Sequence, residues 1–193
     1  MSSSCPRRPL FGGALSACLP SSFLDASAVR EVPDAQEVFT DACSEQSLVI
    51  ELVEAQPGVQ DAAAARFFWD DLAEANSAET TSWQALAVPA EALPGLLREP
   101  RDARAGALLC CQGTMQLEAA ACQGRAASVS TFLAVLRLPA VGSELLLTLN
   151  VPEQAGAEGA GAQPREAAAA RGRELLLSTL ASLSIHDWGL FSP

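Results

Sequence analysis

The 193-residue sequence contains no lysine and no tyrosine, and its single histidine is His186. All twelve basic residues are arginines. No side chain can therefore form a Schiff base or serve as the lysine of a phosphate-binding P-loop. A serine hydrolase triad would have to use His186, and the Gly-x-Ser-x-Gly motif that carries such a serine is absent. These absences predict a protein that binds a partner and is not an enzyme.

Long apolar runs and metal-binding motifs are also missing. No segment approaches the ~18 uninterrupted apolar residues of a membrane-spanning helix, and the polar start is not typical of a signal peptide. Without a Cys-x-x-Cys pair and with one histidine, a zinc site is poorly supported. We expect no cofactor, no metal, no direct membrane insertion, and reduced thiols in a nuclear or cytosolic protein. Its six cysteines are at positions 5, 18, 43, 110, 111 and 122.

The length and the 49% hydrophobic content fit one domain with a substantial core. The pattern of apolar residues predicts strands, one helix, a run of strands and a last helix, which is an α+β fold with a largely antiparallel sheet. We expect a flexible N-terminal tail over residues 1–9, a single domain over residues 10–193, and a flexible loop at about 153–165, where glycine and alanine are frequent.

Local signals place the elements along the chain. Asp25 or Ser27 can cap a short helical turn, and Gly172 should weaken the last helix by ~1 kcal/mol. The apolar end of the sequence should dock against the domain. The expected strands are 15–19, at an edge, and 37–40, 47–54, 80–88, 107–117, 129–138 and 144–150, and the expected helices are 61–74 and 164–183.

The net charge of −11 lies in one quarter of the sequence. The segment from Glu31 to Glu79 contains twelve acidic residues and one basic residue, Arg66, whereas the rest of the chain carries no net charge. This charge disfavours nucleic acids and anionic membranes as partners. It indicates either an ordinary solvated face or an acidic surface that attracts a basic partner.

Glu51 and Glu54 interrupt the apolar strand predicted over residues 47–54. Because they are three residues apart, a regular strand puts them on opposite faces, and a bulge or the strand end near Glu54 would be needed to align them. Each could contact a partner at the surface, or one could pair internally with an arginine from elsewhere in the chain. The sequence pattern leaves both alternatives open.

Several stretches together resemble one family in order and spacing. They include Leu10-Phe-Gly-Gly-Ala, Arg30-Glu-Val-Pro-Asp-Ala-Gln-Glu-Val-Phe, Gln46-Ser-Leu-Val-Ile-Glu-Leu-Val-Glu and His186-Asp-Trp-Gly-Leu-Phe, and the most specific piece is the Val-Pro-Asp-x-Gln-Glu-Val block. Over residues 9–192 the sequence resembles the Ran guanine-nucleotide release factors, the Mog family. This resemblance implies an α/β/α sandwich with an antiparallel sheet of about six strands, similar to the photosystem subunit P fold.

The resemblance also implies a function and a site. It implies binding to the small GTPase Ran, promotion of nucleotide release from Ran, and a role in nuclear transport in nucleus and cytoplasm. The matching positions imply that Glu51 and Glu54 contact Ran. The preceding block adds Arg30, Asp34 and Glu37 as further partner-binding residues. An alternative is a trafficking adaptor that holds a basic cytoplasmic segment of a membrane protein such as a voltage-gated sodium channel. That role would recruit the protein peripherally to the plasma membrane.

Overall fold

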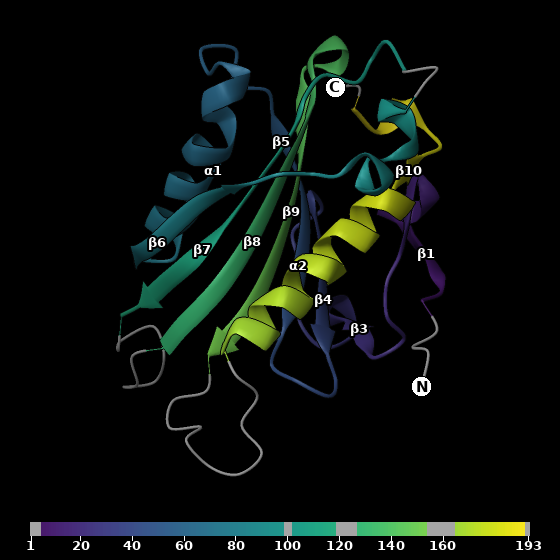
Figure 1. The fold of residues 1–193 in the computed structure, drawn as a ribbon. Coiled ribbons are helices and arrows are strands. Elements are labelled where there is room, and N and C mark those ends of the chain that lie inside the picture. Colours follow the sequence, from purple (N-terminus) through teal and green to yellow (C-terminus); the bar gives the residue numbers. More distant parts are fainter. Residues whose placement is uncertain (1–4, 99–101, 119–126, 154–164, 192–193) are drawn as a thin grey trace.

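A computed structural model describes residues 5–98, 102–118, 127–153 and 165–191. Its centre is a seven-stranded antiparallel sheet in the order β3-β4-β5-β9-β8-β7-β6 (Figure 1). In chain order these strands are β3 (Phe23–Asp25), β4 (Gln36–Asp41), β5 (Ser47–Glu54), β6 (Ala78–Leu86), β7 (Leu108–Leu117), β8 (Ala127–Leu138) and β9 (Ser143–Glu153).

Two helices cover opposite faces of this sheet (Figure 1). Helix α1 (Asp61–Ala75) packs on β6, β7 and β8, and helix α2 (Arg165–Ser182) packs on β8 and β9. A second sheet lies beside α2, in the order β1-β2-β10, from β1 (Arg7–Leu10), β2 (Leu15–Cys18) and β10 (Ser184–Ile185). The predicted α+β fold, an α/β/α sandwich, is therefore confirmed, with seven strands in the main sheet in place of about six.

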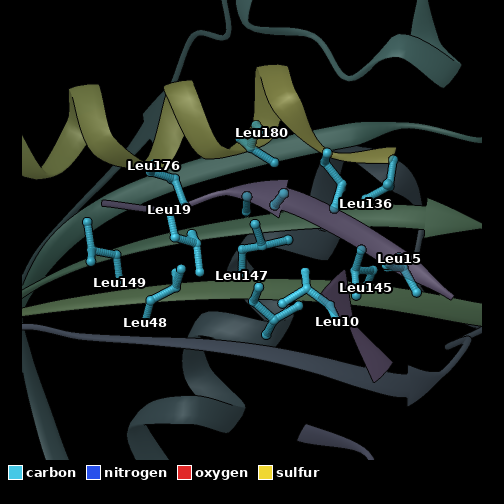
Figure 2. Close-up of a cluster of buried hydrophobic side chains, with 14 of the residues drawn as sticks. Leu10, Leu15, Leu19, Leu48, Leu136, Leu145, Leu147, Leu149, Leu176 and Leu180 are labelled. Carbon is cyan, nitrogen blue, oxygen red and sulfur yellow. The ribbon is translucent and has the colours of Figure 1, made fainter. Parts of the chain in front are cut away.

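The core on the α2 side is built mainly from leucines (Figure 2). Leu176 and Leu180 of α2 are fully buried against side chains from β1, β2, β5, β8 and β9. The last turn of the chain, η6 (Trp188–Phe191), closes this core, because Phe191 is buried in it. The predicted docking of the terminal segment is thus confirmed.

The core on the α1 side contains the aromatic residues of the helix. Phe68 and Trp69 are buried against Cys111, Met115 and Leu133 of the sheet. The Trp69 indole N–H donates to Thr80 Oγ1 at 2.9 Å, so its polar atom is satisfied inside the core. Because α1 lies on β6–β8, it leaves the same face of β4 and β5 without a helix above it.

Three local predictions differ from the structure. Residues 7–9, expected in a flexible tail, form most of β1, because the Arg7 guanidinium donates to Ser16 Oγ and to the Ser182 carbonyl, contacts that no local pattern indicates. Strand β2 is central in its sheet and not an edge strand. Strand β9 continues through Pro152, which pairs with Val129. Residues 1–4 and most of the predicted loop, 154–164, lie outside the described residues.

Gly172 has a packing role that its helix propensity does not reveal. A Cβ atom at this position would lie 2.5 Å from Cε2 of Phe132 in β8. The absence of a side chain therefore allows α2 to approach the sheet closely. Gly172 therefore lowers the helix propensity of α2, as predicted, but the packing of α2 on β8 requires it.

Candidate functional site

The pairing of β4 with β5 gathers acidic residues at one corner of the main sheet. Gln36 stands opposite Glu51, and one residue further the Leu52 N–H donates to the Ala35 carbonyl at 2.9 Å. Asp34 lies just before this pairing, in a turn in which the Gln36 N–H donates to the Pro33 carbonyl at 2.9 Å. We call Asp34, Glu51 and Glu54 the acidic corner.

Glu51 is half-buried on the face of β5 that also carries Val49 and Val53. Its Oε1 accepts a hydrogen bond from Nε2 of its cross-strand neighbour Gln36 at 2.7 Å. The contact is with a neutral amide, so it orients the carboxylate without neutralising its charge. Glu51 therefore presents a positioned negative charge on the part of the sheet that α1 leaves uncovered.

Glu54 is exposed and is the last residue of β5. Pairing between β5 and β9 runs without interruption from Ser47 to Glu54, so no bulge aligns Glu54 with Glu51. The two side chains therefore leave opposite faces of the strand, as a regular strand requires. Among the described residues, neither carboxylate pairs with an arginine. The described ion pairs thus give no support to the internal-pairing alternative.

The other three predicted site residues have different surroundings. Glu37 accepts a hydrogen bond from the backbone N–H of Phe11, a residue with φ of 48°. It thereby supports the turn between β1 and β2, and with Asp34 it lines a groove of about 430 Å³. Arg30 is exposed, and its backbone N–H donates to the Ala26 carbonyl at 3.0 Å. The structure therefore places Asp34 in the turn two residues before Gln36, the cross-strand partner of Glu51, whereas Glu37 also has a structural task.

The segment before the corner begins with a capped turn. The Asp25 side chain accepts a hydrogen bond from the Ser27 N–H at 2.8 Å at the start of η2 (Ala26–Ala28). Of the two capping candidates in the sequence, Asp25 and Ser27, the structure therefore selects Asp25. The cap fixes the direction in which the chain leaves β3 toward Arg30 and Asp34.

The concentrated negative charge lies at the surface. None of the twelve carboxylates between Glu31 and Glu79 is buried. Two of them are paired with arginines, Asp61 with Arg137 and Asp70 with Arg66. Carboxylates of this kind form strong hydrogen bonds with guanidinium and ammonium groups of a partner. In the described part of the chain, no three His, Cys, Asp or Glu side chains are arranged to hold a metal ion.

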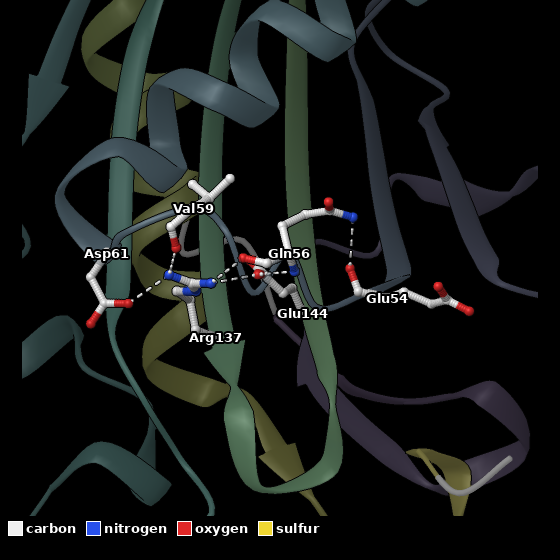
Figure 3. A network of polar contacts seen from close by, with 6 residues as sticks. All are labelled: Glu54, Gln56, Val59, Asp61, Arg137 and Glu144. Atoms are coloured by element: carbon white, nitrogen blue, oxygen red, sulfur yellow. Dashed lines mark hydrogen bonds and ion pairs between the residues drawn. The ribbon is translucent and has the colours of Figure 1, made fainter.

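A buried ion pair lies directly behind the corner and was not predicted from the sequence (Figure 3). Arg137 Nη2 of β8 donates to Glu144 Oε1 of β9 at 3.1 Å, and the two side chains are 12% and 1% exposed. The two residues are cross-strand partners in the β8–β9 hairpin. An arginine and a glutamate inside two apolar runs that pair as a hairpin are the signal that could have revealed them.

This pair holds the loop that follows Glu54 (Figure 3). Arg137 donates to the carbonyls of Gln56 and Val59, at 3.1 and 2.7 Å, and to Asp61 Oδ1 at 2.7 Å. Glu144 Oε1 accepts the backbone N–H of Gln56 at 3.1 Å. Both backbone polar groups of Gln56 are therefore bound by the ion pair.

The arrangement of layers defines the class of fold. The chain superposes on the cyanobacterial PsbP protein from Synechocystis with a TM-score of 0.53 and 10% identity, over 96% of this chain and 95% of that one. It superposes on the Ran-binding protein Mog1p from Saccharomyces cerevisiae with a TM-score of 0.72 and 23% identity, over 99% and 100% of the two chains. The predicted likeness to the photosystem subunit P fold is confirmed.

Sequence similarity identifies the family within that fold. Residues 8–152 match the family described as Ran-interacting Mog1 protein. The human Ran guanine nucleotide release factor is 38% identical over 189 residues, which cover 96% of both chains. The chain belongs to the Mog1 family. Neither helix in the described residues is long and apolar enough to cross a bilayer.

Proposed function

We propose that this chain binds Ran and promotes the release of guanine nucleotide from it, and so acts in nucleocytoplasmic transport. The observation that carries the proposal is membership of the Mog1 family through a match that contains the whole acidic corner. The carboxylates of Glu54 and Asp34, which are exposed, and of Glu51, which is half-buried, form no ion pair among the described residues and are suited to a basic surface on a protein partner. The expected locations are therefore the nucleus and the cytoplasm.

The mechanism follows from binding linkage. If the acidic corner binds basic groups that are better presented in nucleotide-free Ran, it stabilises that state. Binding of this chain then lowers the affinity of Ran for its nucleotide. The factor is the same as the one by which loss of the nucleotide raises the affinity of Ran for this chain. A coupling of ~3 kcal/mol corresponds to a change of about 150-fold. Such an effect requires no catalytic group in this chain.

The test is the dissociation rate of a fluorescent guanine nucleotide from Ran, measured with increasing amounts of this protein. We expect the dissociation rate of the nucleotide to rise with protein concentration and to reach a plateau. At higher salt, a higher protein concentration should be needed for half of this rise, because salt screens the exposed charges that make the contact. Direct binding to Ran loaded with GDP, loaded with GTP or free of nucleotide identifies the favoured state. Unchanged dissociation at saturating protein would reject the release activity.

A matched control uses a carboxylate far from the corner. Glu79 is exposed on β6, at the other end of the main sheet. Glu79→Ala removes the same charge as Glu54→Ala, so it corrects for the change in net charge. We expect Glu79→Ala to act on Ran like the unaltered protein. Equal losses in both variants would show that overall charge, and not the acidic corner, governs binding.

The sodium-channel adaptor remains a prediction, because neither the described residues nor the similar proteins bear on a channel. A cytosolic pull-down separates the two functions. Retention of Ran supports the proposal made above. Retention of a channel segment without Ran would favour the adaptor.

A further inference from the structure

We infer that Arg137 and Glu144 are positioning residues, which hold the chain after β5 so that Glu54 is presented to a partner. The inference rests on the proposed function of the acidic corner. Neither residue is expected to touch the partner, because both side chains lie beneath the surface, with exposures of 12% and 1%. They act through the backbone of residues 54–61.

The first argument is the set of contacts that leads from the ion pair to Glu54. The ion pair binds both the N–H and the carbonyl of Gln56. The Gln56 side chain in turn donates through Nε2 to the carbonyl of Glu54 at 3.3 Å. The Ala55 N–H donates to the Gly142 carbonyl at 2.9 Å, in the turn between β8 and β9. Each of these contacts fixes backbone within two residues of Glu54.

The second argument is the direction of the Glu54 side chain. Figure 3 shows its carboxylate pointing away from the network, while its carbonyl faces Gln56. The network thus holds the backbone of Glu54 and leaves its charged group available. A carboxylate whose backbone is held binds a cation with less loss of conformational entropy than one on a loose strand end.

The third argument is that the ion pair is poorly explained as a stabilising device. Glu144 Oε2 is buried and has no hydrogen-bond partner among the described residues. Leaving a buried carboxylate oxygen unsatisfied lowers stability, and apolar residues of similar volume often replace buried ion pairs without loss. Holding a loop with directional contacts is what an ion pair does and an apolar pair does not.

The test replaces both members together, so that no single buried charge is left behind. We expect the double variant Arg137→Met/Glu144→Leu to remain folded. Its Gln56 amide should exchange hydrogen faster, and its affinity for Ran should fall by about tenfold or more. In a Glu54→Ala background the double variant should cause little further loss, because the pair acts through Glu54.

A matched control breaks a polar contact on the other side of the sheet. Arg173 Nε of α2 donates to Gln112 Oε1 of β7 at 2.9 Å. Arg173→Met should leave both the affinity for Ran and the exchange of Gln56 unchanged. If the double variant does not fold, Arg137→Lys takes its place, because one ammonium group cannot reach the four acceptors that the guanidinium binds.

The outcomes separate this inference from the proposed function. A folded variant with fast exchange at Gln56 and unchanged affinity for Ran overturns the inference. Losses that add fully to that of Glu54→Ala also overturn it. If Ran does not bind the unaltered protein, the proposed function fails. Hydrogen exchange of the Gln56 amide then tests the inference by itself. Slow exchange of this amide in the double variant would overturn the positioning role.

Discussion

Glu54 and Glu144 lie on neighbouring strands, one register position apart, yet their surroundings are opposite. Glu54 stands opposite Ser143 and is exposed, whereas Glu144 stands opposite Val53 and is buried against Arg137. The exposed carboxylate is available to another protein, and the buried one binds its own chain. The role of each glutamate therefore depends on what covers it, because a buried charge needs an internal partner and an exposed one does not.

The largest effect should come from Glu144→Ala. It removes the buried carboxylate partner of Arg137, leaving it the exposed Asp61, and it also removes the acceptor of the Gln56 N–H, which together cost about 3–5 kcal/mol of unfolding free energy. Urea unfolding measures this loss, with Glu54→Ala as the control on the exposed side. Equal stabilities of the two variants would remove the distinction between the buried and the exposed glutamate.

Glu54→Ala should have little effect on stability and a large effect on binding to Ran. Its unfolding free energy should stay within about 0.5 kcal/mol of the unaltered protein, because an exposed side chain is lost. Its binding to Ran should weaken by about 2–5 kcal/mol if the carboxylate is hydrogen-bonded to a cation in the complex. Titration calorimetry with Ran gives the affinity, and thermal unfolding gives the stability. A lowered melting temperature with unchanged affinity would identify Glu54 as a structural charge.

The Gly172→Ala variant tests whether the contact between α2 and β8 tolerates added volume. The new Cβ would meet the Phe132 ring at 2.5 Å. Overpacking of about 1–3 kcal/mol should exceed the ~1 kcal/mol gained in helix propensity, so the variant should be less stable. Urea unfolding shows whether the unfolding free energy falls or rises. Ser178→Ala, on the exposed side of the same helix, is the control. A more stable Gly172→Ala variant would show that α2 can move away from β8.

The cysteines should give the smallest effect. Burial, with the neighbouring Cys111 thiol as a second cause, raises the pKa of Cys110 to about 12. Burial also raises the pKa of Cys111 to about 12. Neither thiol should react with maleimide at pH 7.5, whereas the exposed Cys43 should react, and peptide mass spectrometry distinguishes the sites.

The same pKa values predict a dependence of stability on pH. Above about pH 9 the two thiols ionise in the unfolded chain but stay protonated in the fold, so the unfolding free energy should fall as the pH rises toward 12. Unfolding at pH 8 and pH 10 measures this slope. A Cys110→Ala/Cys111→Ala variant should show a shallower slope.

Much of the fold could be predicted from local sequence. Strand β5 has the predicted bounds, 47–54, because its β-branched residues and the following Gln56-Pro57-Gly58 turn are both local signals. Helix α1 follows from the apolar residues Ala65, Phe68, Trp69 and Leu72 at helical spacing, of which the first three are buried. Strand β1 was missed, because its four residues contain Arg7, Arg8 and Pro9 and are held by distant partners.

For the candidate site, the sequence by itself determined the amount of negative charge and the segment that carries it, since both are properties of composition. It also determined that Glu51 and Glu54 leave opposite faces of β5, because side chains alternate along any regular strand. Only the tertiary structure decided that Gln36 stands opposite Glu51 and donates a hydrogen bond to it, and that Glu37 accepts a hydrogen bond from the Phe11 N–H. It also decided that Glu144 is buried, because burial depends on which distant segments pack above a strand, and no local pattern contains that information.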